Sequence, residues 1–404
     1  MDATEEAPLA GLLVLDISSF IAGPAAATAL GDFGADVIKI EPPGAGDPHR
    51  LNYTSPNYPP SDVNFPWQLD ARNKRSLALD LKNVEGRAVL DRLLARADVM
   101  IVNFPAPVRE RLRLRWEDVE AINPRLVYCS LTGYGESGPD RDRPGFDVTA
   151  YFGRSGILDM ARYENGPPGV SLPAQGDRAT AMTLVAAILM GLRRRDKTGK
   201  GGWVGTSLYA NGVWSNGTST AAALIGAYSG ARPPRETPRN ALTNLYRTAD
   251  DRWIQLALVR DDRMWEPFCA AIERTNLVTD PRFGTRPDRR ARAVELSREL
   301  DPAFAAKTYP EWEKILGEAG ITFGVIGRLR DVVDDEQAEH AGIFSDTTNP
   351  AIPRTVNNPI RLGFAKPRVS GPPPEVGEHN EAVLRELGYD DAAIAALKNA
   401  GALG

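Results

Sequence analysis

Short apolar runs alternate with helix-like segments over the first 130 residues, and this alternation constrains the fold more than any other feature of the chain. Runs typical of buried strands occur at 12–18, 36–41, 98–104 and 126–135. Gly23-Pro24 is expected to break the first run, and residues 25–34 predict a helix that ends near Gly34. Asn83 is placed to cap a second helix over 85–96. Alternation of this kind predicts an α/β fold with an open parallel sheet of the Rossmann-like type.

Ligands of such sheets bind beyond the carboxyl ends of the strands. The segments that follow the four predicted strands would therefore converge on one crevice. They are Ser19–Pro24, Glu41–Gly46, Asn103–Pro107 and Thr132–Gly138.

A chain of 404 residues is too long for one ordinary core, and two domains are expected. Residues 246–258 predict a hairpin with Asp250-Asp251 at its turn, and helical segments follow it. We therefore assign 225–330 to a small α+β domain, and 1–224 with 331–404 to a large α/β domain. The tail predicts two short helices, with Gly388 ending one and Asp390 capping the next.

Composition excludes several classes of protein. The hydrophobic share is 42% and the net charge is -5, which is ordinary for a soluble chain and argues against a nucleic-acid surface. The acidic N-terminus shows no leader peptide, and the longest apolar run, 184–192, is too short to span a bilayer. A cytoplasmic protein without membrane or nucleic-acid partners is expected.

Cysteine and histidine are both scarce. Cys129 and Cys269 form no CxxC pair, so neither a structural zinc site nor a disulfide framework is expected. The only histidines are His49, His340 and His379. A Ser-His-Asp hydrolase or a histidine-rich metal site would have to draw on these three residues, so we predict no metal.

Asp177 is the first candidate for catalysis. It directly follows Gln175-Gly176 and precedes an apolar segment, 179–192, that predicts a buried helix. The free N–H groups and positive dipole end of a helix would keep this carboxylate ionised, and an ionised carboxylate can attack an activated acyl group. The alternative is that Asp177 only caps the helix, because Asp is among the preferred N-cap residues.

Several motifs, in this order, resemble the family III CoA-transferases, which include formyl-CoA and carnitine CoA-transferases and have acyl-CoA racemases as close relatives. The motifs begin with Leu9–Pro24, continue with GADVIKIEPPGAGD and NKRSLALDLK, and extend to GEHN near the C-terminus. Between these lie VNF at 102–104, Gly176-Asp177 and KTGKG at 197–201. The resemblance covers nearly the whole chain.

The resemblance implies an activity, a nucleophile and an assembly. CoA would pass from an acyl-CoA thioester to a carboxylic acid, with Asp177 carrying first an acyl anhydride and then CoA as a thioester. Such an intermediate survives only where water is kept out. CoA would be a substrate and product, with no tightly bound cofactor. The family also implies an interlocked homodimer.

The resemblance also implies which residues bind CoA: Ile21, Leu79, Lys82, Asn103, Phe104 and Arg111. Adenine and phosphates need an apolar slot together with cations and N–H groups. Lys82 and Arg111 could instead be solvated surface charges, and Asn103 could be a turn residue.

Three departures from the family bear on the reaction. The family's racemases use a His-Asp pair where this chain has Phe146-Asp147, so the imidazole is missing. Formyl-CoA transferase has a glutamine where this chain has Ile21, and its glycine-rich flap has no counterpart here. Formate and oxalate are therefore poor candidate substrates, and a more apolar acyl group is favoured.

Three other functions stay open at this point. A 2-methylacyl-CoA racemase would use Asp177 as one base and Asp147 or water as the other. A nicotinamide-dependent dehydrogenase would need G-x-G-x-x-G after the first strand, where the chain reads SFIAGP with a single glycine. The third is a protein that binds CoA without catalysing a reaction.

Overall fold

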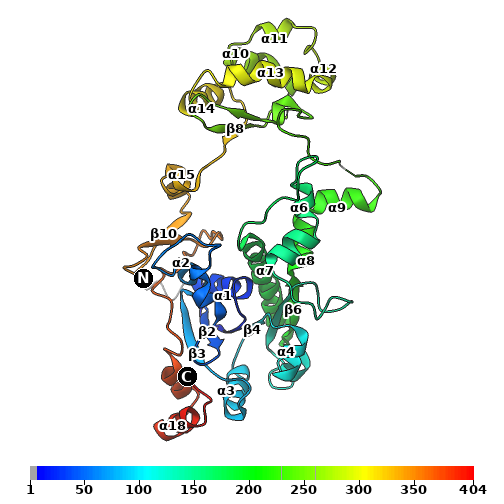
Figure 1. The fold of residues 1–404 in the computed structure, drawn as a ribbon. Helices are drawn as coiled ribbons and strands as arrows, with labels where there is room; N and C mark the ends of the chain where they lie inside the picture. Colours follow the sequence, from blue (N-terminus) through cyan, green and yellow to red (C-terminus); the bar gives the residue numbers. More distant parts are fainter. Residues whose placement is uncertain (1–6, 229, 260) are drawn as a thin grey trace. The chain divides into compact units, whose positions relative to one another are not determined.

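Two compact units make up the computed structural model, which describes residues 7–228, 230–259 and 261–404. The larger unit comprises the described residues of 1–159, 169–228 and 339–404, and the smaller those of 160–168 and 229–338. Figure 1 shows the path of the chain. The domain limits predicted at 224/225 and 330/331 stay predictions.

A six-stranded parallel sheet forms the larger unit, with strand order β3-β2-β1-β4-β5-β6. This confirms the predicted α/β class. No local pattern predicts β3, whose run KRSLA mixes charged and apolar residues. The strands are β1 (Leu13–Ile17), β2 (Asp36–Glu41), β3 (Lys74–Ala78), β4 (Val99–Val102), β5 (Val127–Thr132) and β6 (Gly202–Ser207).

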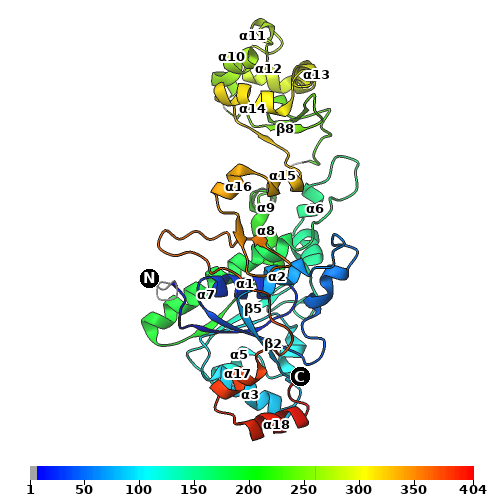
Figure 2. The same ribbon diagram turned by 90° about the vertical axis from the view of Figure 1, so that its left-hand side faces the viewer.

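Both faces of this sheet are buried, because successive side chains of a strand point to opposite faces. Leu15 and Ile17 belong to the core cluster shared with α3 (Val84–Leu94), α17 (Asn380–Glu386) and α18 (Asp391–Asn399). Val14 belongs to the opposite cluster, shared with α1 (Ala22–Asp32) and α7 (Gln175–Thr198). Figure 2 shows the two helical layers on either side of the strands.

Several helix ends follow their predicted signals. Asn83 accepts a hydrogen bond from the backbone N–H of Glu85 and caps α3, and Asp390 accepts one from Ala393 and caps α18. Gly388 lies between the last two helices at φ 86°. The helix predicted from residue 25 begins at Ala22, so Gly23-Pro24 lies inside it rather than before it. Both residues lie in the first turn of α1, where a proline without an N–H is tolerated.

Shorter elements complete the larger unit. Phe344–Asp346 (β10) and Arg354–Val356 (β11) form a separate antiparallel pair. The remaining helices are η1 (Pro48–Thr54), α2 (Phe65–Ala71), α4 (Ala106–Arg111), α5 (Trp116–Glu120), η2 (Asp147–Arg154), α6 (Ile157–Met160, which reaches the smaller unit), α8 (Leu208–Ser215), α9 (Gly217–Leu224) and α16 (Glu336–His340, at the junction).

The smaller unit is α+β, as predicted. Its hairpin, β7 (Leu245–Arg247) and β8 (Trp253–Leu256), pairs antiparallel, and β9 (Phe323–Val325) extends the sheet. The predicted helical segments follow the hairpin, and two of the helices, Arg286–Ala291 and Ala293–Phe304, meet at Arg292. The helices are η3 (Ala241–Thr243), α10 (Asp261–Ala271), α11 (Asn276–Thr279), α12 (Arg286–Ala291), α13 (Ala293–Phe304), α14 (Tyr309–Glu318) and α15 (Leu329–Val333).

Candidate active site

Asp177 lies in the first turn of α7, the long helix that covers one face of the sheet. The residue before the helix is Ala174, at φ 64°, so Asp177 does not occupy the capping position. Gly176 packs directly on Tyr151 of η2, and a Cβ at position 176 would lie 2.5 Å from the Tyr151 ring. Glycine is required here because no larger residue allows α7 to begin so close to η2.

The direction of α7 places its first turn near the ligand-binding edge of the sheet. This helix leads into β6, which runs parallel to β5. A helix that connects parallel strands runs back antiparallel to them, so it begins at their carboxyl ends. Asp177 therefore lies on the edge predicted to form the crevice.

Asp177 is surrounded by acidic groups. Burial and the nearby carboxylates of Asp147 and Asp70 raise the pKa of Asp177 to about 7, and Arg178 only partly opposes them. The expectation that a helix N-terminus keeps this carboxylate fully ionised is therefore wrong. Loss of solvent and repulsion between like charges outweigh the favourable dipole. A half-buried carboxyl group that changes charge near neutral pH is typical of a reactive site.

Asp147 lies in η2, beside the start of α7. Burial raises the pKa of Asp147, while the backbone N–H groups of Val148, Ala174 and Gly176 act in the opposite direction. Asp147 thus contacts the same turn that carries Asp177. Two neighbouring carboxyl groups with raised pKa values are thereby present at one helix end.

Arg178 pairs with Asp70 of α2. Its two terminal nitrogens lie 2.7 and 3.1 Å from the Asp70 oxygens. The fully buried Asp70 also lies 3.0 Å from Nε2 of His49. Asp70 and Arg178 were not among the predicted site residues. The signal available in the sequence was a basic residue directly after the proposed nucleophile, but nothing there pointed to its partner.

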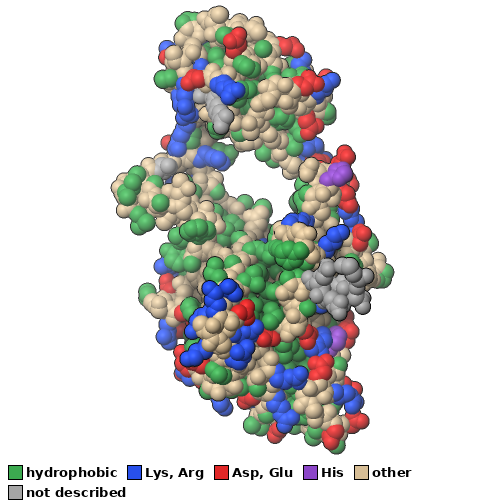
Figure 3. Space-filling model, turned by 180° about the vertical axis from the view of Figure 1, so that it is seen from behind, with side chains coloured by type: hydrophobic (Ala, Val, Ile, Leu, Met, Phe, Trp, Pro, Cys, Tyr) green, Lys and Arg blue, Asp and Glu red, His purple; other side chains and the backbone are tan. Residues whose placement is uncertain are grey.

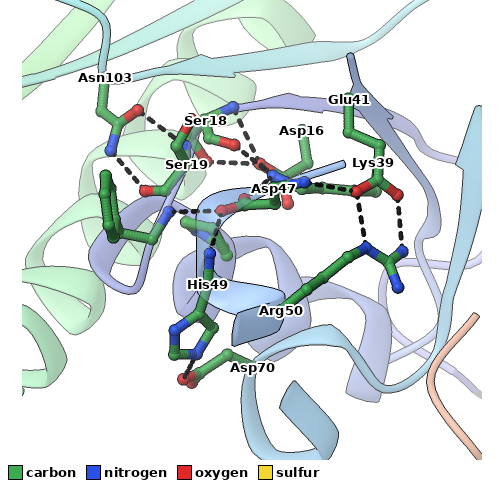
Figure 4. Close-up of polar contacts among 12 residues, drawn as sticks. Asp16, Ser18, Ser19, Lys39, Glu41, Asp47, His49, Arg50, Asp70 and Asn103 are labelled. Atoms are coloured by element: carbon green, nitrogen blue, oxygen red, sulfur yellow. Dashed lines mark hydrogen bonds and ion pairs between the residues drawn. The ribbon is translucent and has the colours of Figure 1, made fainter. Parts of the chain in front are cut away.

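The loop after β1 is held by side chains from other strands (Figure 4). Asn103, just beyond β4, accepts a hydrogen bond from the Ser19 N–H at 2.8 Å and donates one to the Ser19 carbonyl at 2.8 Å. Strand order reverses between β1 and β4, which is where sheets of this type bind their ligands. Asn103 therefore joins the two loops at that point.

A buried charge network underlies the same loop (Figure 4). Lys39 of β2 lies 2.7 Å from Asp47 and also donates to the Ser18 carbonyl. Asp16 of β1 pairs with Lys74 at 2.9 Å. Asp47 in turn accepts a hydrogen bond from the backbone N–H of Phe20 at 3.1 Å. The loop rests on fixed charges rather than on apolar packing alone.

The other predicted CoA-binding residues differ in exposure. Ile21 and Leu79 are buried, at 6% and 1%, and follow β1 and β3 respectively. Phe104 is half-buried after β4, whereas Lys82 and Arg111 are exposed. Ile21, Leu79, Asn103 and Phe104 thus all lie just beyond strands, at one edge of the sheet, whereas Arg111 lies at the end of α4.

An aromatic pair is present beside this edge. The rings of Phe20 and Phe146 meet edge to face, with centroids 5.8 Å apart. Phe146 precedes Asp147 in the chain, and both rings are exposed, at 36% for Phe20 and 55% for Phe146. Phe20 has φ 65°, a left-handed conformation that is strained for an aromatic residue. The fold maintains this strain while presenting the ring to solvent.

Two kinds of feature are absent from the described residues. No cluster of three or more His, Cys, Asp or Glu side chains in that part of the chain is arranged to hold a metal ion. None of the helices in the described ranges is both long and apolar enough to cross a membrane.

Comparison with known proteins identifies the family. The model of CoA-transferase family III matches residues 9–380. The (R)-2-hydroxy-4-methylpentanoate CoA-transferase of Clostridioides difficile is 34% identical over 96% of this chain and 97% of its own. The cinnamoyl-CoA:phenyllactate CoA-transferase of Clostridium sporogenes is 33% identical over 96% and 95%. The succinyl-CoA:glutarate CoA-transferase of Mus musculus is 31% identical over 100% and 92%.

Solved structures agree with these relatives. A crystal structure of a CAIB/BAIF family protein from Brucella suis has a TM-score of 0.83 at 29% identity, over 94% of this chain and 99% of its own. Rv3272 from Mycobacterium tuberculosis has a TM-score of 0.79 at 30% identity, over 92% and 98%. The chain belongs to CoA-transferase family III and is an enzyme that transfers CoA between an acyl-CoA and a carboxylic acid.

Proposed function

We propose that Asp177 carries the transferred group covalently. Its carboxylate oxygen attacks the thioester carbonyl and the C–S bond breaks. CoA departs as the thiolate, and the acyl group stays on Asp177 as an acyl-aspartyl anhydride. The thiolate then attacks the aspartyl carbonyl of this anhydride, which releases the first acid and leaves CoA on Asp177 as a thioester. The acceptor carboxylate repeats these steps in reverse order, and the final thiolate attack on its acyl carbonyl restores the Asp177 carboxylate.

The observation that carries this proposal is the acidic environment of Asp177. Burial, Asp147 and Asp70 all disfavour its charged form, and raise its pKa to about 7. The anhydride and the thioester are both uncharged, so acylation removes the repulsion and the loss of hydration together. A carboxylate in this position is more basic, and a better nucleophile, than an ordinary surface Asp.

Trapping with hydroxylamine tests the covalent step. Hydroxylamine with acyl-CoA should inactivate the enzyme, and mass spectrometry should find a hydroxamate at Asp177. Hydroxylamine without acyl-CoA should leave the enzyme active, because a free carboxylate does not react. Inactivation with no modification of Asp177, or continued turnover in its presence, would contradict the proposal.

The alternative reaction is exchange at the α-carbon of an acyl-CoA. Two carboxyl groups with raised pKa values, Asp177 and Asp147, favour it as a second candidate. They would have to face opposite sides of one carbon atom. Incubation of a chiral 2-methylacyl-CoA in deuterated water, without an acceptor acid, measures this exchange. Absence of deuterium in the recovered thioester would exclude it.

We infer that the acyl group is apolar and branched or aromatic. The Phe20–Phe146 pair supplies exposed aromatic surface next to Asp147. Ile21 also replaces a polar glutamine of formyl-CoA transferase, although it is buried. The relatives from Clostridioides and Clostridium are named for (R)-2-hydroxy-4-methylpentanoate and for cinnamoyl-CoA and phenyllactate, whose hydrocarbon parts fit an apolar pocket.

Replacing Phe146 with alanine should lower kcat/KM for aryl and branched acids by about 10- to 100-fold, because an apolar side chain contributes roughly that much discrimination. The value for acetate should change little. Steady-state kinetics with the three acids measures the ratio. Phe364→Ala is the matched control, because Phe364 is also exposed, at 70%. Equal losses for all three acids would contradict the assignment.

A second copy of the chain is the expected partner. Apolar side chains gather on the surface of α8 and α9, the projection at the left of Figure 3. Trp214, Leu224 and Ile225 are all more than four-fifths exposed. Exposed apolar patches of this kind mark interaction surfaces. They support the predicted homodimer, which stays a prediction, as does the cytoplasmic setting.

A further inference from the structure

The buried carboxylate of Asp70 lies between Arg178, the residue after the proposed nucleophile, and the buried His49. Arg178 reaches it with two nitrogens, at 2.7 and 3.1 Å, although the arginine side chain is 39% exposed. Asp70 and His49 are both fully buried. A partly exposed guanidinium held in a two-point pair has little freedom to turn elsewhere. The pair therefore fixes the cation nearest in sequence to Asp177.

The histidine completes the arrangement in a defined form. Nδ2 of Asn52 lies 2.9 Å from His49 Nδ1, and an amide NH2 can only donate. The Nδ1 atom is thus the acceptor, and the proton of the neutral ring lies on Nε2, which faces Asp70 at 3.0 Å. Figure 4 shows the His49 ring turned toward Asp70. Asp70 accepts hydrogen bonds from both sides and stays charged.

We infer that Asp70 is a positioning residue of the transferase site, which holds the Arg178 guanidinium so that it cannot pair with Asp177. This inference rests on the proposed function of Asp177. Without Asp70 the guanidinium would be free to turn toward the adjacent carboxylate. A nucleophile paired with arginine is less basic, and its charge is already stabilised before it attacks.

The groups that face Asp177 come from four parts of the chain. Asp147 lies on η2, Asp70 on α2 and Arg178 on α7, and all three act on the charge of Asp177. The Tyr58 hydroxyl, between η1 and α2, also senses it: burial raises the pKa of Tyr58, and Asp70 and Asp177 add to the rise. Burial alone would raise the pKa of Asp70, but Arg178 and His49 lower it overall.

The pH dependence of kcat/KM tests the inference. Only ionised Asp177 attacks, so kcat/KM should rise with pH through the pKa of about 7. Asp70→Asn removes one negative charge and frees Arg178, and both changes favour ionised Asp177. The acid limb is the part of the pH profile in which kcat/KM rises with pH. Its midpoint should therefore move to lower pH by at least about one unit, as expected for a carboxylate that gains an arginine neighbour. Arg178→Gln should move it up, because the cation that lowers the Asp177 pKa is lost.

A double variant separates the two effects of Asp70. If Asp70 acts by holding Arg178, Asp70→Asn must shift the limb less in the Arg178→Gln background than in the wild type. An equal shift in both backgrounds would mean that Asp70 acts through its own charge alone, and would overturn the inference. Arg178→Gln keeps an amide donor for Asp70. Arg178→Lys carries the test if Asp70→Asn fails to fold, because lysine keeps the positive charge but cannot form the two-point pair with Asp70. Its limb should move down as the freed cation approaches Asp177, and an unmoved limb would overturn the inference.

Asp32→Asn is the matched control. Asp32 is also buried and holds Arg72 through two nitrogens, at 2.8 and 3.1 Å, but it does not act on Asp177. Its loss should lower stability and leave the limb near pH 7. Infrared difference titration of the Asp177 carboxyl gives the same pKa without activity. If the covalent mechanism is wrong, hydroxylamine will form no hydroxamate at Asp177 of the wild type. If only the positioning role is wrong, the hydroxamate will form normally and Asp70→Asn will leave the acid limb at the wild-type pH.

Discussion

Asp177→Ala is expected to abolish CoA transfer while leaving CoA binding intact. Removing the nucleophile of a covalent mechanism lowers kcat by a factor on the order of 10⁴ or more, because no other group can form the intermediate. The Kd for CoA should change by less than about threefold, because the implied binding residues lie beyond β1, β3 and β4. A tenfold change in Kd would need the loss of about 1.4 kcal/mol of binding free energy. Initial rates and calorimetric titration with CoA measure the two quantities.

The fold of this variant provides an internal check. A carboxyl group whose pKa is raised in the folded state binds its proton more tightly when folded, so its ionised form destabilises the fold above that pKa. The Asp177 pKa is raised to about 7, so the alanine variant should be at least as stable as the wild type at pH 8. Gln175→Ala, an exposed change in the same turn, is the matched control and should keep normal turnover. Normal turnover by Asp177→Ala would refute the covalent mechanism.

Local patterns were sufficient to predict most of the larger unit. The run DVIKIE predicts its strand with the same bounds as β2, because every side chain after Asp36 is buried against a helical layer or a fixed charge. The caps at Asn83 and Asp390 are also local, since each carboxylate or amide oxygen bonds a backbone N–H only two or three residues ahead. Such features need no knowledge of distant segments.

Features that depend on tertiary contacts were not predictable in this way. The strand β3 contains Lys74 and Arg75, which look exposed in the sequence, yet Lys74 is buried by its pair with Asp16. The predicted charge state of Asp177 was wrong for the same reason. A helix start predicts a stabilised carboxylate, but Asp70 and Asp147 come from segments more than 100 and about 30 residues away. Only the folded chain brings these like charges together.

The candidate site shows the same division. The motifs that carry the family resemblance place Asp177 and Asn103, and the structure puts both at the carboxyl edge of the sheet. The pairing of Arg178 with Asp70, and the left-handed backbone of Phe20, leave no mark on periodicity or composition. We infer the substrate class and the basicity of the nucleophile from these features.

Asp16→Ala is expected to cause the largest loss of stability. Asp16 is fully buried between Lys39 and Lys74, with its oxygens 3.8 and 2.9 Å from the two ammonium nitrogens. Its removal leaves Lys74 with only the carbonyl oxygens of Pro24 and Asp70. Breaking a buried ion pair by removing one partner costs about 3–5 kcal/mol, because the remaining charge is uncompensated. Hydrogen exchange of peptides covering β1, followed by mass spectrometry, measures this loss within the larger unit.

The control and the pH dependence separate charge from packing. Asp142→Ala removes the exposed pair with Arg141, 3.3 Å apart, and should cost less than about 1 kcal/mol. Burial alone would raise the pKa of Asp16, but Lys39 and Lys74 lower it overall. Its stabilisation is therefore present above the unfolded-state pKa of about 3.9 and is lost as pH falls through the lower folded value. The wild-type advantage over Asp16→Ala should accordingly shrink as acid is added. An advantage that stayed constant from pH 6 to about pH 2 would assign the loss to a cavity instead, since a missing side chain costs the same at every pH.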